Sequence, residues 1–216
     1  MDIAQKNIIN KLPLIAILRG IRPEECIDIG CELFKVGFRI IEIPLNSPEA
    51  FKSIEKLALK LKDEAIIGAG TILNIKQLKL LSDAGGKLAV MPHTDLKIVE
   101  MAKKLNLICF PGVASPTEAI SALDAGADGL KIFPAEMIIP KVLKSWKAIL
   151  PKNTMLFPVG GIEPESMAPY VLAGATGFGI GSALYKPGKN VLEVAKKGRA
   201  FIKSWEKIKF SLNESK

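Results

Sequence analysis

Eight short apolar runs recur at nearly even spacing along this chain of 216 residues. Nearly all of them are continuous rather than alternating, which is typical of strands buried on both faces of a parallel sheet that helices cover. The runs predict strands at Leu14–Leu18, Arg39–Pro44, Ala65–Gly70, Leu88–Met91, Leu107–Phe110, Gly129–Pro134, Met155–Val159 and Gly177–Ile180.

A helical stretch follows each predicted strand, and one more precedes the first. Ser47, Asp95 and Ser115 are suited to cap helix starts, whereas Gly37 is suited to end a helix. The predicted helices cover about Asp2–Lys11, Pro23–Val36, a stretch starting at Ser47 and Pro48, a stretch from Asn74, Asp95–Leu105, Pro116–Ala125, Met137–Leu150, Glu163–Ala173 and Val191–Lys207, and Phe210–Lys216 is expected to be a frayed tail.

Eight strand–helix units that close on themselves predict a (β/α)8 barrel of the TIM type, with a short helix before it and residues 1–216 as one domain. Of these residues 49% are hydrophobic, which is enough for one large core. An open doubly wound sheet is the alternative, but no G-x-G-x-x-G motif follows the first strand.

The composition argues against nucleic acid or a membrane as a partner. The formal net charge is +8, but the basic residues are spread over almost every helical stretch and only 6% of residues are aromatic. No apolar run is long enough to span a bilayer, and residues 1–10 lack a signal pattern. Cys26, Cys31, Cys109 and the single histidine, His93, do not form a typical metal site. We therefore expect free thiols, no metal and a cytoplasmic protein.

Lys131 points most directly to chemistry, because it lies within a strand expected to be buried. Burial disfavours the ammonium, and a neutral amine at the carboxyl end of a barrel strand can attack a ketone and form a Schiff base. Glu42 is a lone carboxylate in the second predicted strand. Beside Lys131 it would act as general acid and base, and each charge would explain the burial of the other. The alternatives are a lysine and a glutamate that reach solvent.

Glycine corners follow the seventh and eighth predicted strands, at Gly160–Gly161 and at Gly181–Ser182. Backbone N–H groups at these corners, next to a helix N-terminus, predict a phosphate site. Thr71 and Arg19 are suited to hold a carboxylate at the other end of the ligand. The alternatives are tight turns at the glycines, a helix cap at Thr71 and a surface charge at Arg19.

Five segments together resemble the 2-keto-3-deoxy-6-phosphogluconate (KDPG) aldolase family, in order and with few gaps. The segments are Leu18–Gly20, Glu42–Pro48, Gly68–Thr71, Lys131–Glu136 and Val159–Gly161. The resemblance implies a class I aldolase with a (β/α)8 fold that needs no cofactor and forms a homotrimer. It matches Lys131 to the Schiff-base lysine and Glu42 to the general acid and base.

The resemblance also assigns roles in binding. Thr71 and Pro92 match residues at the pyruvyl end of the ligand, and Phe133 matches the aromatic ring beside the imine. The residues that match the phosphate clamp are Gly160, Gly161, Gly181 and Ser182.

Two positions separate the branches of this family. Asn46 stands where the gluconate branch usually has arginine, and Val159 stands where it tends to have threonine. With the Arg19 loop, they make the chain look more like the branch that acts on 2-keto-3-deoxy-6-phosphogalactonate, the C4 epimer. The reaction expected is cleavage to pyruvate and glyceraldehyde 3-phosphate.

Other functions fit part of the same pattern. The gluconate epimer and 4-hydroxy-2-oxoglutarate are the alternative aldolase substrates. A phosphosugar isomerase or epimerase would use Glu42 as the base and Lys131 as an electrostatic stabiliser, with no imine. A non-catalytic phosphate sensor or a basic nucleic-acid-binding barrel is the remaining hypothesis.

Overall fold

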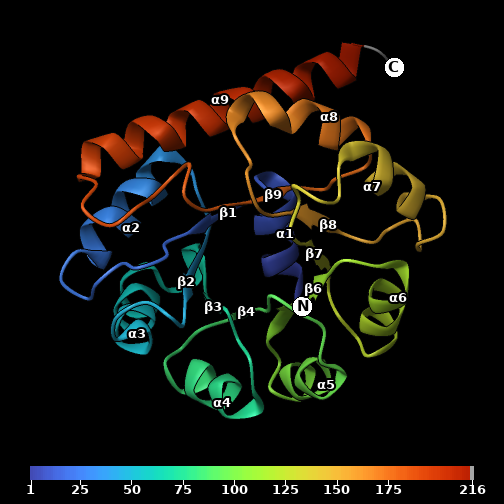
Figure 1. Ribbon diagram of the computed structural model, residues 1–216. Helices are drawn as coiled ribbons and strands as arrows, with labels where there is room; N and C mark the ends of the chain where they lie inside the picture. The colour runs from blue at the N-terminus through green and yellow to red at the C-terminus, as the bar shows by residue number, and fades with distance from the viewer. Residues whose placement is uncertain (215–216) are drawn as a thin grey trace.

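The computed structural model describes residues 1–214, and its strands are parallel and surrounded by helices in sequence order (Figure 1). The strands are β1 (Leu14–Ile17), β2 (Ile40–Pro44), β3 (Ile66–Gly70), β4 (Leu88–Val90), β5 (Ile108–Phe110), β6 (Gly112–Val113), β7 (Leu130–Ile132), β8 (Leu156–Pro158) and β9 (Phe178–Ile180). The helices are α1 (Ile3–Lys11), α2 (Cys26–Val36), α3 (Ala50–Leu61), α4 (Ile75–Asp83), α5 (Leu96–Lys104), α6 (Pro116–Asp124), α7 (Pro140–Lys147), α8 (Met167–Leu172) and α9 (Val191–Glu214), with 3-10 helices η1 (Lys62–Glu64) and η2 (Pro164–Ser166).

The strands form two hydrogen-bonded sheets. A curled sheet of six strands has the order β5-β4-β3-β2-β1-β9, and a sheet of three has the order β6-β7-β8. Pro111 alone separates β5 from β6, and proline offers no N–H to a ladder. A parallel bridge between Val159 and Gly179 joins the end of β8 to β9. The α/β class that the apolar runs predicted is confirmed, and the structure adds a short strand that was not predicted, β6, after the fifth one.

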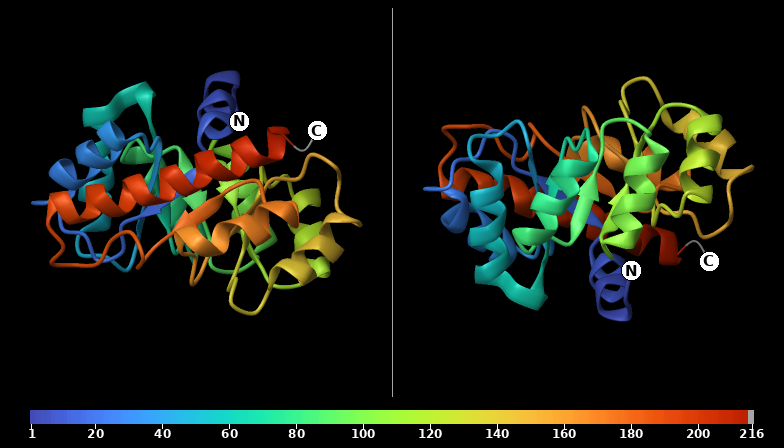
Figure 2. Two further views of the ribbon diagram at one scale, coloured as in Figure 1. Left: turned by 90° about the horizontal axis from the view of Figure 1, so that it is seen from above. Right: turned by 90° about the horizontal axis from the view of Figure 1, so that it is seen from below.

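The buried core forms two clusters, one on each face of the sheet, because successive side chains of a strand point to opposite faces. In β1, Leu14 and Ala16 belong to a core cluster under the helices, whereas Ile15 and Ile17 belong to a second cluster on the concave side. Every residue of β1 is buried, which explains its continuous apolar run. Ile9 of α1 completes the second cluster, and α1 projects from one side of the molecule (Figure 2).

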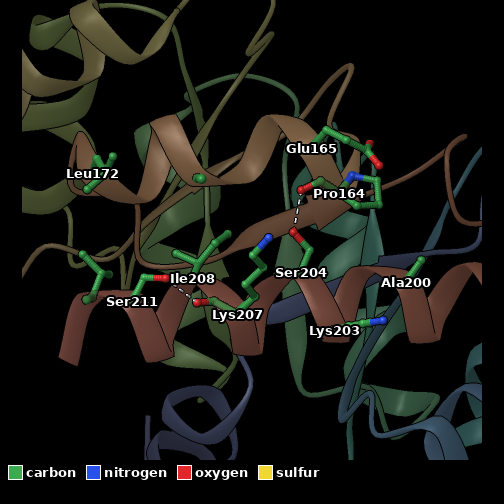
Figure 3. Close-up of a pocket in the computed structure, with 11 residues that line it drawn as sticks. Pro164, Glu165, Leu172, Ala200, Lys203, Ser204, Lys207, Ile208 and Ser211 are labelled. Carbon is green, nitrogen blue, oxygen red and sulfur yellow. Dashed lines mark hydrogen bonds between the residues drawn. The ribbon is translucent and has the colours of Figure 1, made fainter. Parts of the chain in front are cut away.

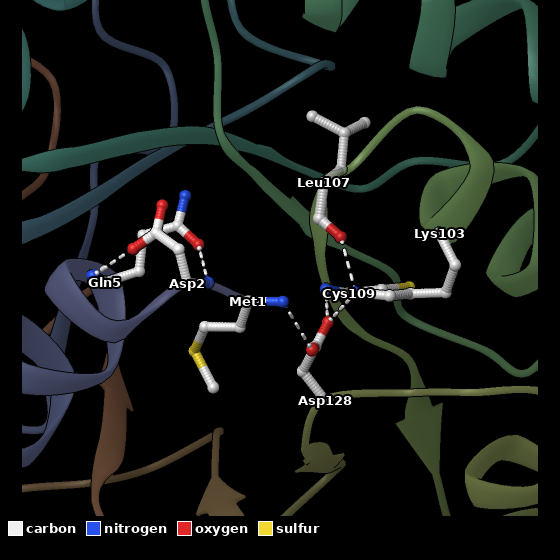
Figure 4. Close-up of polar contacts among 7 residues, drawn as sticks. All are labelled: Met1, Asp2, Gln5, Lys103, Leu107, Cys109 and Asp128. Atoms are coloured by element: carbon white, nitrogen blue, oxygen red, sulfur yellow. Dashed lines mark hydrogen bonds and ion pairs between the residues drawn. The ribbon is translucent and has the colours of Figure 1, made fainter.

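Asp128 ties β5, α5 and the start of β7 together (Figure 4). Its carboxylate accepts a hydrogen bond from the Cys109 N–H at 2.9 Å and pairs with the ammonium of Lys103. The amino group of Met1 lies 3.5 Å from the other carboxylate oxygen. Lys103 also donates to the Leu107 carbonyl, at 2.9 Å. The Asp128 side chain is only 11% exposed, so these partners offset the cost of burying its charge.

Predicted caps were right where the contacts are local. The Asp95 side chain accepts from the N–H groups of Lys97 and Ile98, and the Ser115 hydroxyl accepts from the Glu118 N–H. The prediction for Ser47 was wrong, since α3 begins at Ala50. The Ser47 hydroxyl accepts instead from the Gly20 N–H at 2.8 Å, a partner 27 residues away.

Other helix limits also differ from the predictions. α2 begins at Cys26 instead of Pro23, and α7 is limited to Pro140–Lys147. α9 continues to Glu214, where a frayed tail was expected from Phe210, and residues 215 and 216 lie outside the described part. Buried Trp205 anchors this last helix by an edge contact with Phe178. Within residues 1–214, no helix combines the length and apolar character needed to cross a membrane.

Candidate active site

Lys131 is the middle residue of β7 and is only 4% exposed. It stands in register with Phe157 of β8, a member of the concave-side cluster, so its side chain shares that side. Its Nζ lies 4.4 Å from the centre of the Phe133 ring. The predicted burial of this amine is therefore observed.

Glu42 lies in β2 and is 2% exposed. It stands in register with Ile17 of β1, which places it on the concave side as well. Gly70 makes room for the carboxylate, because a Cβ at that position would overlap it. Glu42 Oε2 has no hydrogen-bond partner among the residues described. An unpartnered buried carboxylate oxygen is costly and therefore marks a functional candidate.

The electrostatics of Glu42 and Lys131 are linked. Burial raises the pKa of Glu42 to about 7, while the charges of Lys131 and Arg19 act in the opposite direction. Burial lowers the pKa of Lys131; Glu42 opposes this change and Arg19 adds to it. A carboxyl that titrates near neutrality beside an amine that loses its proton readily suits proton transfer and nucleophilic attack.

A cavity of about 430 Å³ opens beside Lys131, between the loops that follow β1, β7, β8 and β9. It contains eight of the eleven residues that the sequence marked for this site. These are Arg19, Lys131, Phe133, Val159, Gly160, Gly161, Gly181 and Ser182.

The two glycine corners lie side by side, because the bridge between Val159 and Gly179 joins the strand ends that carry them. Gly160 and Gly161 have φ values of 113° and 59°, which side chains disfavour. A Cβ on Gly160 would also overlap the carboxylate of Glu136. The positive φ values therefore favour glycine at this corner, and a side chain at position 160 would also have to displace the end of Glu136.

Glu42, Thr71 and Pro92 are not among the residues that line this cavity. The backbone of Pro92 lies against Gly112, the residue in register with Lys131. Thr71 follows β3 directly and has a positive φ of 57°. The roles assigned to these residues stay predictions.

His93 follows Pro92, and its Nδ1 is buried without a hydrogen-bond partner among residues 1–214. No group of three or more His, Cys, Asp or Glu side chains suited to a metal occurs in the part of the chain that the structure describes. A larger groove of about 580 Å³ lies between α8 and α9, and it contains none of the residues marked from the sequence (Figure 3).

A buried lysine that interacts electrostatically with a buried glutamate and lines a cavity with two glycine corners fits an aldolase that uses a lysine nucleophile. The model of the KDPG and KHG aldolase family matches residues 5–197. The chain belongs to this family. The resemblance seen in the five sequence segments is thereby confirmed, and membership in an aldolase family makes the chain a lyase.

Two relatives show where the chain falls within the family. It is 42% identical over 195 residues to the 2-dehydro-3-deoxy-6-phosphogalactonate aldolase of Escherichia coli (strain K12), covering 90% of this chain and 95% of that one. It is 29% identical over 168 residues to the KHG/KDPG aldolase of the same organism, covering 77% and 78%. The similarity is thus higher to the relative named for the galactonate epimer.

Solved structures give the same family. "Native KDPGal structure" matches with a TM-score of 0.90 and 41% identity, over 92% of this chain and 96% of that one. A KDPG aldolase from Legionella pneumophila matches with a TM-score of 0.81 and 25% identity, over 90% and 96%. Its title states that pyruvate was captured at low pH as a covalent carbinolamine intermediate.

Several residues in or beside this cavity were not among those marked from the sequence. Tyr185 and Lys186 line the cavity, and Glu136 lies against the Gly160–Gly161 corner. Glu136 stands in the recognised Lys131–Glu136 segment, which was the available signal, but its contact with the glycines is tertiary. Tyr185 carried no local pattern that distinguishes it from a core residue.

Proposed function

We propose that the chain is a class I aldolase that cleaves 2-keto-3-deoxy-6-phosphogalactonate to pyruvate and glyceraldehyde 3-phosphate. The observation that carries the proposal is the position of Lys131: a buried amine, near a buried carboxylate, that lines a cavity bearing two glycine corners. Desolvation supplies a neutral nucleophile, and the corners supply backbone donors for a phosphate.

The reaction begins when neutral Lys131 attacks the C2 ketone to form a carbinolamine. Loss of water gives a protonated imine, which accepts electrons from the C3–C4 bond. Glu42, directly or through a water, removes the C4 hydroxyl proton, so that the bond breaks and the aldehyde leaves. The enamine is then protonated at C3, and water releases pyruvate and restores the amine.

The ends of the substrate are held apart from the reacting centre. Gly160, Gly161, Gly181 and Ser182 bind the phosphate, and Val159 packs near C4 in this proposal. Thr71 and Pro92 lie at the pyruvyl end, Arg19 holds the carboxylate and Phe133 flanks the imine. Fixing both ends presents the ketone to Lys131, which supplies the positioning part of the rate enhancement.

The galactonate epimer is proposed over the gluconate epimer for two reasons. Identity is 42% to the relative named for the former and 29% to one named for the latter. Asn46 and Val159 also fit the galactonate branch. Coupled assays with the two phosphorylated sugar acids test the choice, and comparable turnover on both would contradict it.

We further propose that the two sheets act as one closed (β/α)8 barrel within a single domain spanning residues 1–216. The Val159–Gly179 bridge supports closure on one side. On the other, β5 and β6 are separated by Pro111 alone, and the Lys131 N–H donates to the Pro111 carbonyl at 2.9 Å. The family resemblance supports a cytoplasmic homotrimer that needs no cofactor. Light scattering of the purified protein would test the trimer by measuring the mass of the assembly.

The decisive experiment is to incubate the protein with pyruvate and borohydride and to measure its mass. Reduction of the imine should leave a stable adduct that peptide mapping places on Lys131. The Lys131→Met variant is the control and should remain unmodified. An isomerase or epimerase forms no imine, so an unmodified wild-type protein would reject the proposal.

A further inference from the structure

The loop that follows β1 is attached to the loop that follows β2 at two successive residues. Arg19 Nη1 donates to Asn46 Oδ1 at 2.6 Å. The Gly20 N–H donates to the hydroxyl of Ser47 at 2.8 Å. Ser47 is only 6% exposed, so this second bond is sheltered from water. The two bonds fix the Arg19 side chain relative to β2, the strand that carries Glu42.

The same loop is also held from the side of β9. Gly20 has a φ of 84°, and a Cβ there would come within 2.7 Å of Pro187 Cγ. The Tyr185 hydroxyl donates to Glu25 Oε1 at 3.0 Å. These contacts hold the backbone that follows Arg19, at Gly20 and at Glu25. The guanidinium itself is exposed, and Asn46 is the hydrogen-bond acceptor that the described residues provide for it.

Arg19 lines the cavity, and its charge reaches both reacting groups. It helps to lower the pKa of Lys131 and opposes the rise in the pKa of Glu42. Besides Arg19 and Lys131, the charged residues that line the cavity are Glu163 and Lys186. The position of the Arg19 guanidinium therefore affects both the binding of an anionic ligand and the protonation of Lys131.

Asn46 provides a neutral acceptor for this guanidinium. A carboxylate at position 46 would hold Arg19 but would also neutralise its charge, and a hydrocarbon side chain would leave it free to turn into solvent. An amide oxygen orients the cation and leaves its charge available to a ligand.

We propose that Asn46 is a positioning residue that holds the Arg19 guanidinium at the cavity, where it binds the anionic keto acid. This inference rests on the proposed aldolase function. Ser47 assists by fixing the Gly20 backbone. The loop after β2 thereby acts on the ligand through the loop after β1.

The first test is the Asn46→Leu variant, which keeps the size of the side chain and removes the acceptor. We expect KM for the phosphorylated keto acid to rise about five- to tenfold while kcat stays within about twofold, because the lost contact binds substrate and transition state alike. Asn10→Leu, an exposed asparagine of α1 at the opposite end of β1, is the matched control and should leave both constants unchanged.

A double-mutant cycle shows whether Asn46 acts through Arg19. Arg19→Ala should raise KM by itself, and adding Asn46→Leu to it should raise KM no further. Additive effects, or a normal KM in Asn46→Leu, would overturn the inference. Thermal unfolding of each variant establishes that it is folded, and Asn46→Ala replaces the leucine variant if that protein is unstable.

The pH dependence of kcat/KM gives a second test, because it would not change if Asn46 only stabilised the fold. If Arg19 turns away, the pKa values of Lys131 and Glu42 both rise, so the acidic limb of kcat/KM should move to higher pH in Asn46→Leu.

Borohydride trapping distinguishes failure of this inference from failure of the aldolase proposal. A wild-type protein without an adduct rejects the aldolase proposal, whereas an adduct together with an unchanged KM and pH profile in Asn46→Leu rejects the role of Asn46 alone.

Discussion

Glu42 and Lys131 each occupy a strand position that faces the concave side, where their neighbours in register are apolar or glycine. Burial favours the uncharged form of both groups, and their mutual attraction favours the charged form of both. Burial is the larger effect on each group, so it brings the pKa values of Glu42 and Lys131 closer together than they are in water. Small changes in nearby charge are therefore expected to alter the reaction strongly.

The first prediction concerns pH. The pKa of Glu42 is raised to about 7, so the carboxylate proposed to accept the C4 hydroxyl proton is lost as pH falls through that value. The fraction of neutral Lys131 falls in the same direction. We expect kcat/KM to decrease about tenfold for each pH unit below about pH 7. The apparent pKa of this acidic limb belongs to Glu42 and Lys131 together, because the two groups titrate as a coupled pair. A flat profile between about pH 5 and 7 would contradict both assignments.

The second prediction concerns Gly160. In Gly160→Ala an alanine is strained at a φ of 113° and its Cβ overlaps the Glu136 carboxylate, so either that side chain or the corner shifts. KM for the phosphorylated substrate should rise at least about tenfold, whereas pyruvate, which has no phosphate, should still be trapped on Lys131. Gly188→Ala is the control, since its φ is 85° but nothing lies within 4 Å of the added Cβ. Equal losses in both variants would indicate backbone strain alone.

At the scale of elements, the strands were predictable because burial on both faces leaves continuous apolar runs. Caps were predictable where acceptor and donor are neighbours in sequence, as at Asp95. Ser47 was not, because its hydroxyl binds Gly20 across 27 residues. In the site, Lys131 and the glycine corners stood out as exceptions to local patterns. The contacts of Asn46 with Arg19, and of Glu136 with the glycines, depend on folding and left no comparable signal.

The third prediction concerns the attachment of α5 to the sheet. Asp128→Asn removes the charge that pairs with Lys103 in a site that is 11% exposed. We expect a loss of about 1–3 kcal/mol in the free energy of unfolding, or roughly 2–10 °C in Tm, measured by thermal unfolding. Asp63→Asn is the control, because Asp63 pairs with Lys87 while 94% exposed and should contribute little. An equal change in the two variants would contradict this account.

At the scale of the whole molecule, charge is the property that bears on function. The net charge of +8 creates a positive field around a cavity proposed to bind a phosphorylated acid. Such a field speeds the encounter of anions with the site, and salt screens it over distances of about 10 Å at 0.1 M ionic strength.

The fourth prediction follows from this field. Raising the ionic strength from about 0.01 M to about 0.5 M should lower kcat/KM for the phosphorylated substrate several-fold and leave kcat nearly unchanged. Steady-state assays with a non-phosphorylated keto acid provide the control, since its smaller charge should give a weaker dependence. A salt effect confined to kcat would point instead to the chemical step.

Lys131 and Glu42, the amine and carboxylate proposed to react, belong to strands, whereas most of the cavity wall comes from the loops that follow β1, β8 and β9. In the proposed reaction, strand residues therefore make and break bonds, whereas loop residues select the ligand. Laboratory evolution toward other aldehydes should find its useful mutations in those connecting segments, and a retargeted biocatalyst should keep its bond-forming strands unaltered.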